Sequence, residues 1–443
     1  MTTSVDLLGA AAHRKLDRND YKTLSLAALG GALEFYDFVV FVFFAAVLGS
    51  LFFPPEMPDW LRQLQTFGIF AAGYLARPLG GIVIAHFGDL LGRKRMFTLS
   101  IFLMAIPTLA MGLLPTYASV GIAAPLLLLL FRILQGAAIG GEVPGAWVFV
   151  SEHVPRRHTG LAVGTLTAGL TFGILLGSLI ATAINSGYTQ AEVHDYAWRI
   201  PFILGGVFGL FAVYLRRFLE ETPVFKEMHA RQLLAKELPL KAIVKNHLGS
   251  VVLSMLLTWV LSAAIVVVIL FTPTYLQKQF AVAPALSLQA NSLAIVMLTI
   301  GCVVFGMAAD RFGSKWALGV GSLGLLVTSY LFYGSLGSTT PGGLIAGYMV
   351  AGFFVGTVGA VPYVLVHAYP AVVRFSGLSF SYNVAYAIFG GLTPVMLTIW
   401  LKYDTLAPAH YVAALAVLGV VCALVPIPGN AAPHRALPPR DAA

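Results

Sequence analysis

The feature that most constrains this chain is a series of long apolar segments separated by short polar turns. We count twelve segments, and each has or approaches the ~20 residues that a helix needs to cross the hydrocarbon core of a bilayer. Only 10% of the residues are charged, whereas a soluble domain averages about 25%. So few charges cannot cover a water-facing surface of this size. The sequence therefore predicts an all-α membrane protein with twelve transmembrane helices, with the lipid bilayer around it.

The predicted segments fall into two groups of six, on either side of the only long charged stretch. The segments are residues 23–53, 66–86, 96–114, 122–151, 160–184 and 198–215, then 248–276, 287–309, 316–333, 342–369, 378–401 and 410–424. We therefore expect two pseudo-symmetric six-helix bundles. The predicted domains are an N-terminal segment (1–22), a first bundle (23–215), a linker (216–247), a second bundle (248–424) and a tail (425–443).

The distribution of lysine and arginine predicts the orientation. Most of the 27 basic residues fall on the side of the two termini, and only Arg62, Arg199, Lys278 and Lys402 fall on the other side. Because positive loops stay in the cytoplasm, both termini and the linker are expected on the cytoplasmic side of the membrane. The first apolar run is too long for a signal-peptide core and carries two acids, so we interpret it as an uncleaved helix.

Several other classes of protein are disfavoured. The net charge of +8 is spread over short turns and forms no patch for nucleic acid. The two cysteines, Cys302 and Cys422, both lie inside apolar segments and suggest neither a disulfide framework nor a metal site. We find no metal-ligand spacing and no nucleophile elbow, so we expect neither an enzyme nor a bound metal or cofactor.

A turn motif occurs once in each half. The turn at residues 85–95 (AHFGDLLGRKR) and the turn at residues 306–315 (GMAADRFGSK) both fit the pattern small-x-x-x-Asp-x-x-Gly-x-Lys. They occupy the same place in each group of six, as expected of a parallel repeat. Each aspartate can satisfy free N–H groups at a helix start. We interpret the turns as a cytoplasmic gate rather than as simple turns; its residues are Asp89, Arg93, Lys94, Asp310, Arg311 and Lys315.

The motifs together resemble the major facilitator superfamily, and their details resemble its metabolite:proton symporter branch. That branch includes bacterial carriers for citrate, α-ketoglutarate, shikimate and proline/betaine. The matching pieces are LEFYDF (33–38), ARPLGG (76–81), HFGDLLGRK (86–94), RILQGAAIGGE (132–142), WRIPF (198–202), LEETPVF (219–225) and the residues Tyr382, Asn383, Gly390 and Gly391. The chain departs from the superfamily pattern at Ala85, where glycine is usual, and at Leu90, where arginine is usual.

Five charged residues lie within the apolar segments of the first half: Glu34, Asp37, Arg77, Arg132 and Glu142. The second half has none. Placing a charged side chain inside the bilayer costs at least ~2.5–3.5 kcal/mol, so a charge kept there is expected to have a functional or structural role. We therefore expect proton and substrate chemistry mainly in the first half.

Helical geometry groups these charges. Glu34 and Asp37 share one face, and Arg132, Gln135 and Glu142 form one polar stripe. Asp37 and Arg132 reach similar depth, so we predict that they face each other across a central cavity. The family resemblance supports this, since related symporters pair a first-helix acid with a fourth-helix arginine. If substrate engages Arg132, Asp37 can take a proton; Asp37, Glu34 and Arg132 are the predicted proton-coupling residues. The alternative is a structural ion pair.

The resulting prediction is a proton-coupled symporter that imports a small organic acid, because intramembrane arginines suit carboxylates. We expect it to act as a monomer. Two alternatives stay open: a symporter for a zwitterionic osmolyte of the proline/betaine type, and a transporter-like sensor that binds solute without moving it. The predicted substrate-binding residues are Arg77, Arg132, Tyr36, Gln135, Glu142, Tyr275, Tyr363 and Asn383.

Overall fold

The computed structural model describes residues 16–91, 93–140, 142–216, 243 and 245–427. Within these ranges only the backbone is described for residues 19, 82, 84–91, 93–101, 215–216 and 371–372. Everywhere in the described ranges the regular structure is helical, with no strand.

The first half of the chain forms long helices and several short helical segments. They are α2 (Arg18–Phe43), α3 (Ala45–Phe52), α4 (Asp59–Leu91), α5 (Arg93–Leu113), α6 (Tyr117–Val120), α7 (Ala123–Ile139), α8 (Glu142–His153), α9 (Thr159–Gly187), α10 (Gln190–Asp195) and α11 (Ile200–Arg216), with the 3-10 turns η1 (Arg156–His158) and η2 (Ala197–Arg199).

The second half follows the same plan. Its elements are α14 (Leu248–Ala264), the π-helix η3 (Ile265–Phe271), α15 (Thr272–Gln279), α16 (Pro284–Phe312), α17 (Ser314–Ser335), α18 (Pro341–Val355), the 3-10 helix η4 (Gly356–Ala360), α19 (Val361–His367), α20 (Ala371–Ala385), the π-helix η5 (Tyr386–Gly390), α21 (Gly391–Trp400) and α22 (Ala407–Leu424).

The predicted fold class, with twelve crossings, is confirmed. Ten helical segments are long and apolar enough to cross a membrane, and α4 and α5, of 33 and 21 residues, supply the remaining two crossings in the series. Most helices extend a few residues beyond the predicted apolar runs. For example, α4 spans Asp59–Leu91 where the sequence predicts 66–86. A helix continues into the polar boundary because its backbone hydrogen bonds do not depend on the side chains.

Several crossings are interrupted. The first breaks at Phe44. The seventh, tenth and eleventh contain η3, η4 and η5. The first, seventh and tenth crossings each open a set of three helices, whereas the eleventh does not. Irregular helix inside a membrane is tolerated where protein covers it, and it often marks a binding site.

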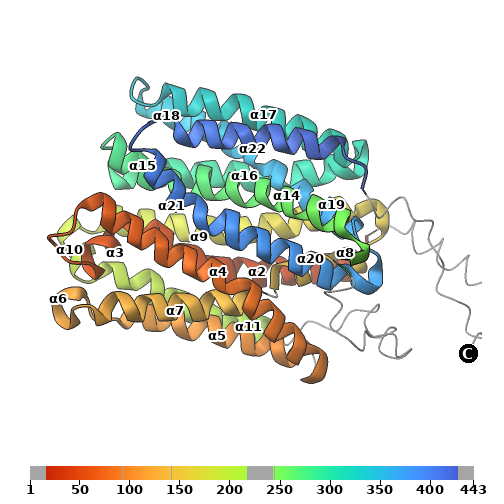
Figure 1. The fold of residues 1–443 in the computed structure, drawn as a ribbon, viewed down its shortest axis with the longest axis horizontal. Helices are drawn as coiled ribbons and strands as arrows, with labels where there is room; N and C mark the ends of the chain where they lie inside the picture. Colours follow the sequence, from red (N-terminus) through yellow and green to blue (C-terminus); the bar gives the residue numbers. More distant parts are fainter. Residues whose placement is uncertain (1–15, 92, 141, 217–242, 244, 428–443) are drawn as a thin grey trace, which may run out of the picture.

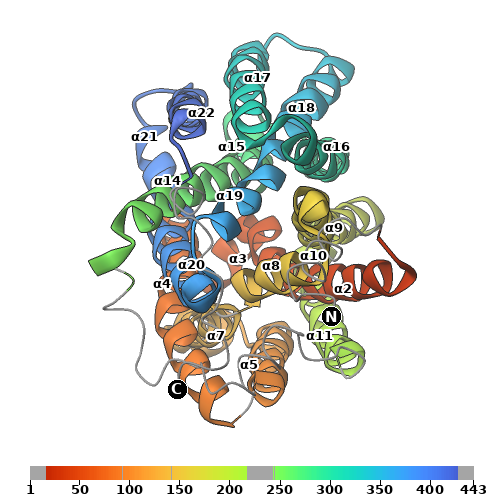
Figure 2. The same cartoon turned by 90° about the vertical axis from the view of Figure 1, so that its right-hand side faces the viewer.

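The two groups of helices lie side by side and touch along their length (Figure 1). The end-on view in Figure 2 agrees with the helix contacts: α16 lies against α9, and α20 lies against α4 and α8. Within the first group α2 packs on α9 and α11, and within the second α17 packs on α18 and α22. The domain limits 23–215 and 248–424 stay predictions, and most of the linker lies outside the described residues.

Glycines allow the closest helix contacts. A Cβ on Gly136 of α7 would collide with the carbonyl of Gly73 in α4, and Gly140 has the same relation to the carbonyl of Arg77. Without side chains at these positions, the backbones of α4 and α7 approach directly. This contact brings Arg77 and the polar stripe on α7 together.

The outer surface is apolar, as a lipid-facing surface must be. Large side chains such as Leu126 on α7, Val207 on α11 and Leu323 on α17 are 57%, 54% and 55% exposed. On a soluble protein so many exposed apolar residues would promote aggregation, whereas in a bilayer they contact lipid tails.

Candidate functional site

Arg77 of α4 lies at the centre of a ring of aromatic side chains from both halves of the chain. Its guanidinium carbon is 4.6 Å from the ring centre of Tyr386 in η5 and 5.4 Å from that of Tyr382 in α20. It is also 5.4 Å from Tyr74 of α4 and 6.0 Å from Phe38 of α2. These distances are within the range of cation–π attraction. We call these five residues the Arg77 cluster.

The Arg77 cluster is buried and has unused hydrogen-bonding capacity. Arg77 is 1% exposed, and its Nε and Nη2 atoms have no acceptor among the residues that the structure describes. Tyr74 and Tyr386 stack across the two halves at 5.2 Å between ring centres, and Trp147 of α8 meets Tyr382 edge-on at 5.1 Å. A buried donor without an acceptor costs about 1–3 kcal/mol, which an anionic ligand would recover.

Arg132 of α7 also packs on the Phe38 ring. Its guanidinium carbon is 3.8 Å from the ring centre of Phe38, and its Nη1 donates to the Phe38 carbonyl at 2.9 Å and to Gln135 Oε1 at 2.5 Å. Its Nε and Nη2 have no partner in the described part of the chain. Both buried arginines therefore lie within 6.0 Å of the centre of the Phe38 ring.

The carboxylate of Asp37 does not face Arg132, contrary to the sequence prediction. Gln135 links the two residues instead: its Nε2 donates to the backbone carbonyl of Asp37 at 2.9 Å and to Thr108 Oγ1 at 2.8 Å. The Asp37 carboxylate points toward α11, where a Cβ on Gly205 would lie 2.7 Å from its Oδ1. The predicted depth of Asp37 agrees with the bonds that Gln135 and Arg132 donate to the carbonyls of Asp37 and Phe38, whereas the predicted direction of its carboxylate is wrong.

The other predicted residues of the first half are buried near this network. Glu34 and Glu142 are 4% and 3% exposed, and each interacts with neighbouring groups. Tyr36 donates its hydroxyl to the carbonyl of Pro201 at 2.8 Å, so in this conformation it points toward α11 and away from the Arg77 cluster.

The predicted residues of the second half separate into one central residue and two peripheral ones. Asn383 of α20 donates through Nδ2 to the carbonyl of Gly140 in the other half, and its Oδ1 has no partner in the described chain. Tyr275 donates to the carbonyl of Thr405 at 2.8 Å, and Tyr363 packs on His367 at 4.4 Å. The helices α15 and α19 lie toward opposite ends of the molecule (Figure 1), and the ring contacts of Tyr275 and Tyr363 are to residues outside the Arg77 cluster.

The turn motif of the second half contacts the first half. Asp310 Oδ1 accepts from the backbone N–H of Gly160 at 2.7 Å, and Oδ2 accepts from that of Leu161 at 2.8 Å. Nearby, Arg374 of α20 pairs with Glu152 of α8 at 3.3 Å. Arg311 and Lys315 are exposed. The side chains of Asp89, Arg93 and Lys94 lie outside the described residues.

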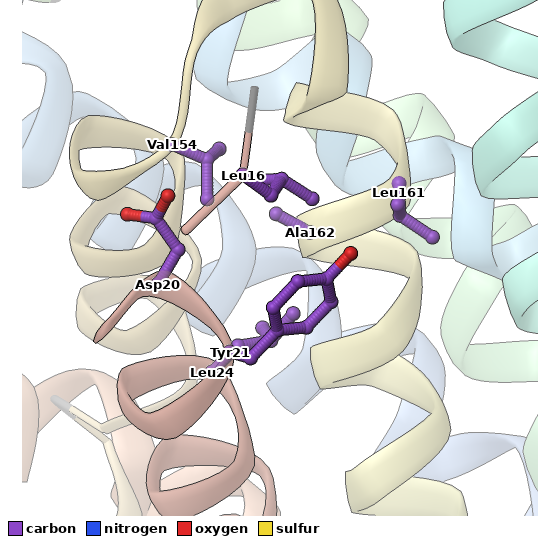
Figure 3. Close-up of a pocket in the computed structure, with 7 residues that line it drawn as sticks. All are labelled: Leu16, Asp20, Tyr21, Leu24, Val154, Leu161 and Ala162. Atoms are coloured by element: carbon purple, nitrogen blue, oxygen red, sulfur yellow. The ribbon is translucent and has the colours of Figure 1, made fainter. Parts of the chain in front are cut away.

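A small hollow lies at the ends of α2, α8 and α9 (Figure 3). It is lined by Leu16, Asp20, Tyr21, Leu24, Val154, Leu161 and Ala162. Most of these side chains are apolar, and none of the predicted site residues contributes to it. It therefore does not serve as the candidate site.

Sequence reasoning missed the aromatic half of the site. The residues that were not predicted as site residues are Tyr74, Tyr382, Tyr386 and Trp147. In the structure all four side chains are at most 2% exposed. Two signals were available: Tyr74 precedes Arg77 by one helical turn, and Tyr382 precedes Tyr386 by one turn. Neither signal is specific, because aromatic side chains are common throughout membrane helices.

Comparison with known proteins identifies the family. The family model described as Major Facilitator Superfamily matches residues 39–394. A Staphylococcus aureus protein named "Putative proline/betaine transporter" is 35% identical over 90% of this chain and 86% of its own length. The "Proline/betaine transporter" of Escherichia coli K12 is 31% identical over 90% of this chain and 82% of its own length.

Solved structures agree on the fold. A D-xylose-proton symporter superposes with a TM-score of 0.70 at 18% identity, over 92% of this chain and 98% of that chain. The xylose transporter XylE from E. coli, in a partially occluded inward-open conformation, gives 0.72 at 17% identity, over 92% and 97%. These proteins are transporters and not enzymes, as the sequence predicts for this chain. The chain is therefore a multi-pass membrane transporter that belongs to the major facilitator superfamily.

Proposed function

We propose that this transporter imports a small zwitterionic solute of the proline/betaine type together with protons, across the bacterial inner membrane. The observation that carries the proposal is the Arg77 cluster, in which one buried guanidinium with free donors is surrounded by aromatic faces. A zwitterion carries a carboxylate, which can bind the arginine, and an ammonium group, which can bind the aromatic rings. Arginine binds carboxylates through two parallel hydrogen bonds, and aromatic rings bind quaternary ammonium groups.

This proposal adopts the zwitterionic osmolyte, one of the two alternatives left open by the sequence, in place of the organic acid that the sequence favoured. A di- or tricarboxylate has several negative charges and no cation, so it would leave the rings of Tyr74, Tyr382 and Tyr386 without a matching group. The names of the relatives from S. aureus and E. coli favour the same alternative. The unpartnered Oδ1 of Asn383 adds an acceptor that suits the N–H groups of a secondary amine such as proline.

Substrate is released when the two halves rock against each other. Tyr74 belongs to the first half and Tyr382 and Tyr386 to the second, so the Arg77 cluster is complete only when the halves meet. Alternating access in such carriers moves one bundle against the other around a central site. Because one chain supplies both sides of the cluster, we propose that a single copy suffices. Both termini lie in the cytoplasm in this proposal, as the basic residues predict.

Uptake into proteoliposomes tests the proposed function. With an imposed pH gradient, acid outside, the purified protein is expected to accumulate radiolabelled glycine betaine or proline, and a proton uncoupler is expected to abolish the accumulation. Citrate and α-ketoglutarate serve as the comparison substrates. Accumulation of a carboxylate instead would restore the organic-acid hypothesis, whereas saturable binding without accumulation would support the solute-sensor alternative.

We also propose that Asp310 holds the cytoplasmic side closed. Its two charge-assisted bonds join α16 to the first turn of α9, where the helix dipole favours a negative group. Arg374 and Glu152 add an ion pair between the same halves. Movement of the halves toward the inward-open state has to break these contacts.

Loss of the Asp310 contacts is expected to open this face more often. Cys302 of α16 is fully buried against α9 and provides a native reporter; a Cβ on Gly164 would lie 2.7 Å from its carbonyl oxygen. In a Cys422→Ala background, Asp310→Asn is expected to speed maleimide labelling of Cys302 by about tenfold. Asp404→Asn, which removes an ion pair with His410 elsewhere in the second half, is the matched control. Equal labelling rates in both variants would remove Asp310 from the gate.

A further inference from the structure

The π-helix η5 carries Tyr386, whose ring belongs to the Arg77 cluster, and Phe389, whose ring contacts a different part of the second half. The centre of the Tyr386 ring is 4.6 Å from the guanidinium carbon of Arg77. The turn is wider than an α-helical turn, because the N–H of Gly391 donates to the Tyr386 carbonyl five residues earlier. Such turns are rare and often occur at functional sites. Neighbouring elements are therefore expected to hold η5 in place.

A proline explains why η5 needs help from a side chain. Pro394 lies in α21, shortly after η5 ends. Because proline has no N–H, the preceding turn lacks one of its backbone donors. The hydroxyl of Thr393 supplies a donor to this turn, since it bonds to the carbonyl of Phe389. Thr393 is 3% exposed, so the end of η5 depends on this buried hydroxyl for part of its hydrogen bonding.

The Thr393 hydroxyl is the last member of a chain of three hydrogen bonds. In the first bond, Trp259 Nε1 of α14 donates to the hydroxyl of Tyr411 in α22 at 2.8 Å. In the second, the hydroxyls of Tyr411 and Thr393 lie 3.0 Å apart. Since the single hydroxyl proton of Thr393 goes to the Phe389 carbonyl, Tyr411 is the donor to Thr393. Each hydroxyl accepts one bond and donates the next, and such bonds strengthen one another.

Phe389 closes this chain into a loop. Its ring stacks on that of Trp259, with 4.1 Å between ring centres and 12° between the planes. The chain of hydrogen bonds that begins at Trp259 thus ends on the backbone of the residue that Trp259 stacks on. Helices α14, α21 and α22 lie together in the second half (Figure 2), and α14 also contacts η5. We call Trp259, Phe389, Thr393 and Tyr411 the Trp259 clamp.

Gly390 connects the Trp259 clamp to the Arg77 cluster. A Cβ on Gly390 would lie 2.6 Å from Cδ1 of Tyr386, so the Tyr386 ring rests directly against this glycine. Gly390 follows Phe389 in the chain, and any shift of Phe389 is passed to the surface that supports the ring. The same ring stacks on Tyr74 of the first half at 5.2 Å. The position of η5 therefore determines how the Tyr386 ring meets Arg77 and Tyr74.

We propose that Trp259, Thr393 and Tyr411 are positioning residues that hold η5 so that the Tyr386 ring is presented to the ammonium group of the substrate. They set the affinity of the Arg77 cluster for a zwitterion without touching it. Loosening the Trp259 clamp lets η5 relax and moves the ring away, so the affinity falls while the loaded carrier reorients at its usual rate. This inference rests on the proposed function, which assigns the ammonium group to these rings.

Removal of single hydroxyls tests the Trp259 clamp by uptake into proteoliposomes. Tyr411→Phe keeps the ring but breaks the chain, and is expected to raise the KM for betaine by about tenfold with an unchanged maximal rate. Tyr330→Phe is the matched control, since it removes a hydroxyl bound to His410 of the same helix α22, and is expected to leave the KM unchanged. An unchanged KM in Tyr411→Phe would overturn the proposal.

A double variant distinguishes one chain from two independent contacts. Thr393→Val keeps the shape of the side chain but removes the last bond, and is also expected to raise the KM. Because both substitutions break the same chain, the double variant is expected to match the weaker-binding single variant. Multiplication of the two effects on the KM would show that the residues act separately and would overturn the proposal.

Fluorine NMR of wild-type protein labelled with 5-fluorotryptophan covers the case in which these variants fail to fold. The chain has six tryptophans, whose signals are assigned by single substitutions to phenylalanine. Betaine is expected to shift the signal of Trp147, which meets Tyr382, and that of Trp259, whereas Trp316, 66% exposed on α17, serves as the reference. A shift at Trp147 without one at Trp259 would overturn the clamp. No shift at either would instead contradict the proposed function itself.

Discussion

Proteoliposomes containing Arg77→Gln are expected to take up betaine at least about thirtyfold more slowly than wild type, at subsaturating substrate. The substitution removes the only charge at the centre of the Arg77 cluster, where a substrate carboxylate would otherwise meet two free N–H donors. Removing one partner of a buried, hydrogen-bonded charge pair costs about 2–5 kcal/mol, and each 1.4 kcal/mol is about tenfold in affinity. The measurement is initial uptake rate against betaine concentration.

Two further variants distinguish the effect of the Arg77 charge from the effect of its donor geometry and from a nonspecific loss of uptake. Arg77→Lys keeps the positive charge but loses the planar pair of donors, so we expect an intermediate loss. Arg62→Gln removes an arginine from the same helix at its exposed end, where it pairs with Asp59, and is expected to leave uptake near wild type. Normal uptake by Arg77→Gln would exclude Arg77 from the substrate site and would leave the aromatic rings to bind substrate alone.

Asp37→Asn is expected to abolish proton-driven accumulation while sparing counterflow exchange. Asparagine fills the same space beside Gly205 but takes no proton, so the carrier stays neutral at this position in every state. Exchange needs only reorientation of the loaded carrier, whereas accumulation needs a proton to be released inside. The measurement is steady-state accumulation under a pH gradient beside the initial rate of counterflow.

The control for Asp37→Asn is Asp195→Asn, an exposed carboxylate at the end of α10. It is expected to preserve both activities. Full accumulation by Asp37→Asn would remove Asp37 from the mechanism. Loss of accumulation and exchange together would indicate that Asp37 has a structural role.

Much of the fold could be predicted because each crossing is an apolar run long enough to span a bilayer, and the described helices match these runs. The interruptions could not be predicted. The π-helix η3 occupies IVVVILF, a run with no glycine, proline or polar residue to mark it. Its geometry depends on packing against neighbouring helices. For example, the ring centres of Phe271 and of Phe67 in the other half are 5.6 Å apart.

The candidate site was predictable where it is charged and not where it is aromatic. Arg77, Arg132 and Asp37 stand out because a charge in an apolar run needs a reason. Tyr74 and Tyr386 do not stand out, and only the fold brings them together. The direction of Asp37 was missed because periodicity gives the spacing of side chains along one helix, whereas the space at Gly205 belongs to another helix.

The split of the aromatic rings between the two halves has a consequence for which solutes are carried. Since Tyr74 stacks on Tyr386 only when the halves meet, a solute must be thin enough to let the two faces close over it. A bulkier analogue with the same carboxylate and ammonium groups would bind to the open conformation but would prevent the two halves from closing. For this chain the upper size limit of a cargo is therefore set by the closing step, and oversized analogues become competitive blockers.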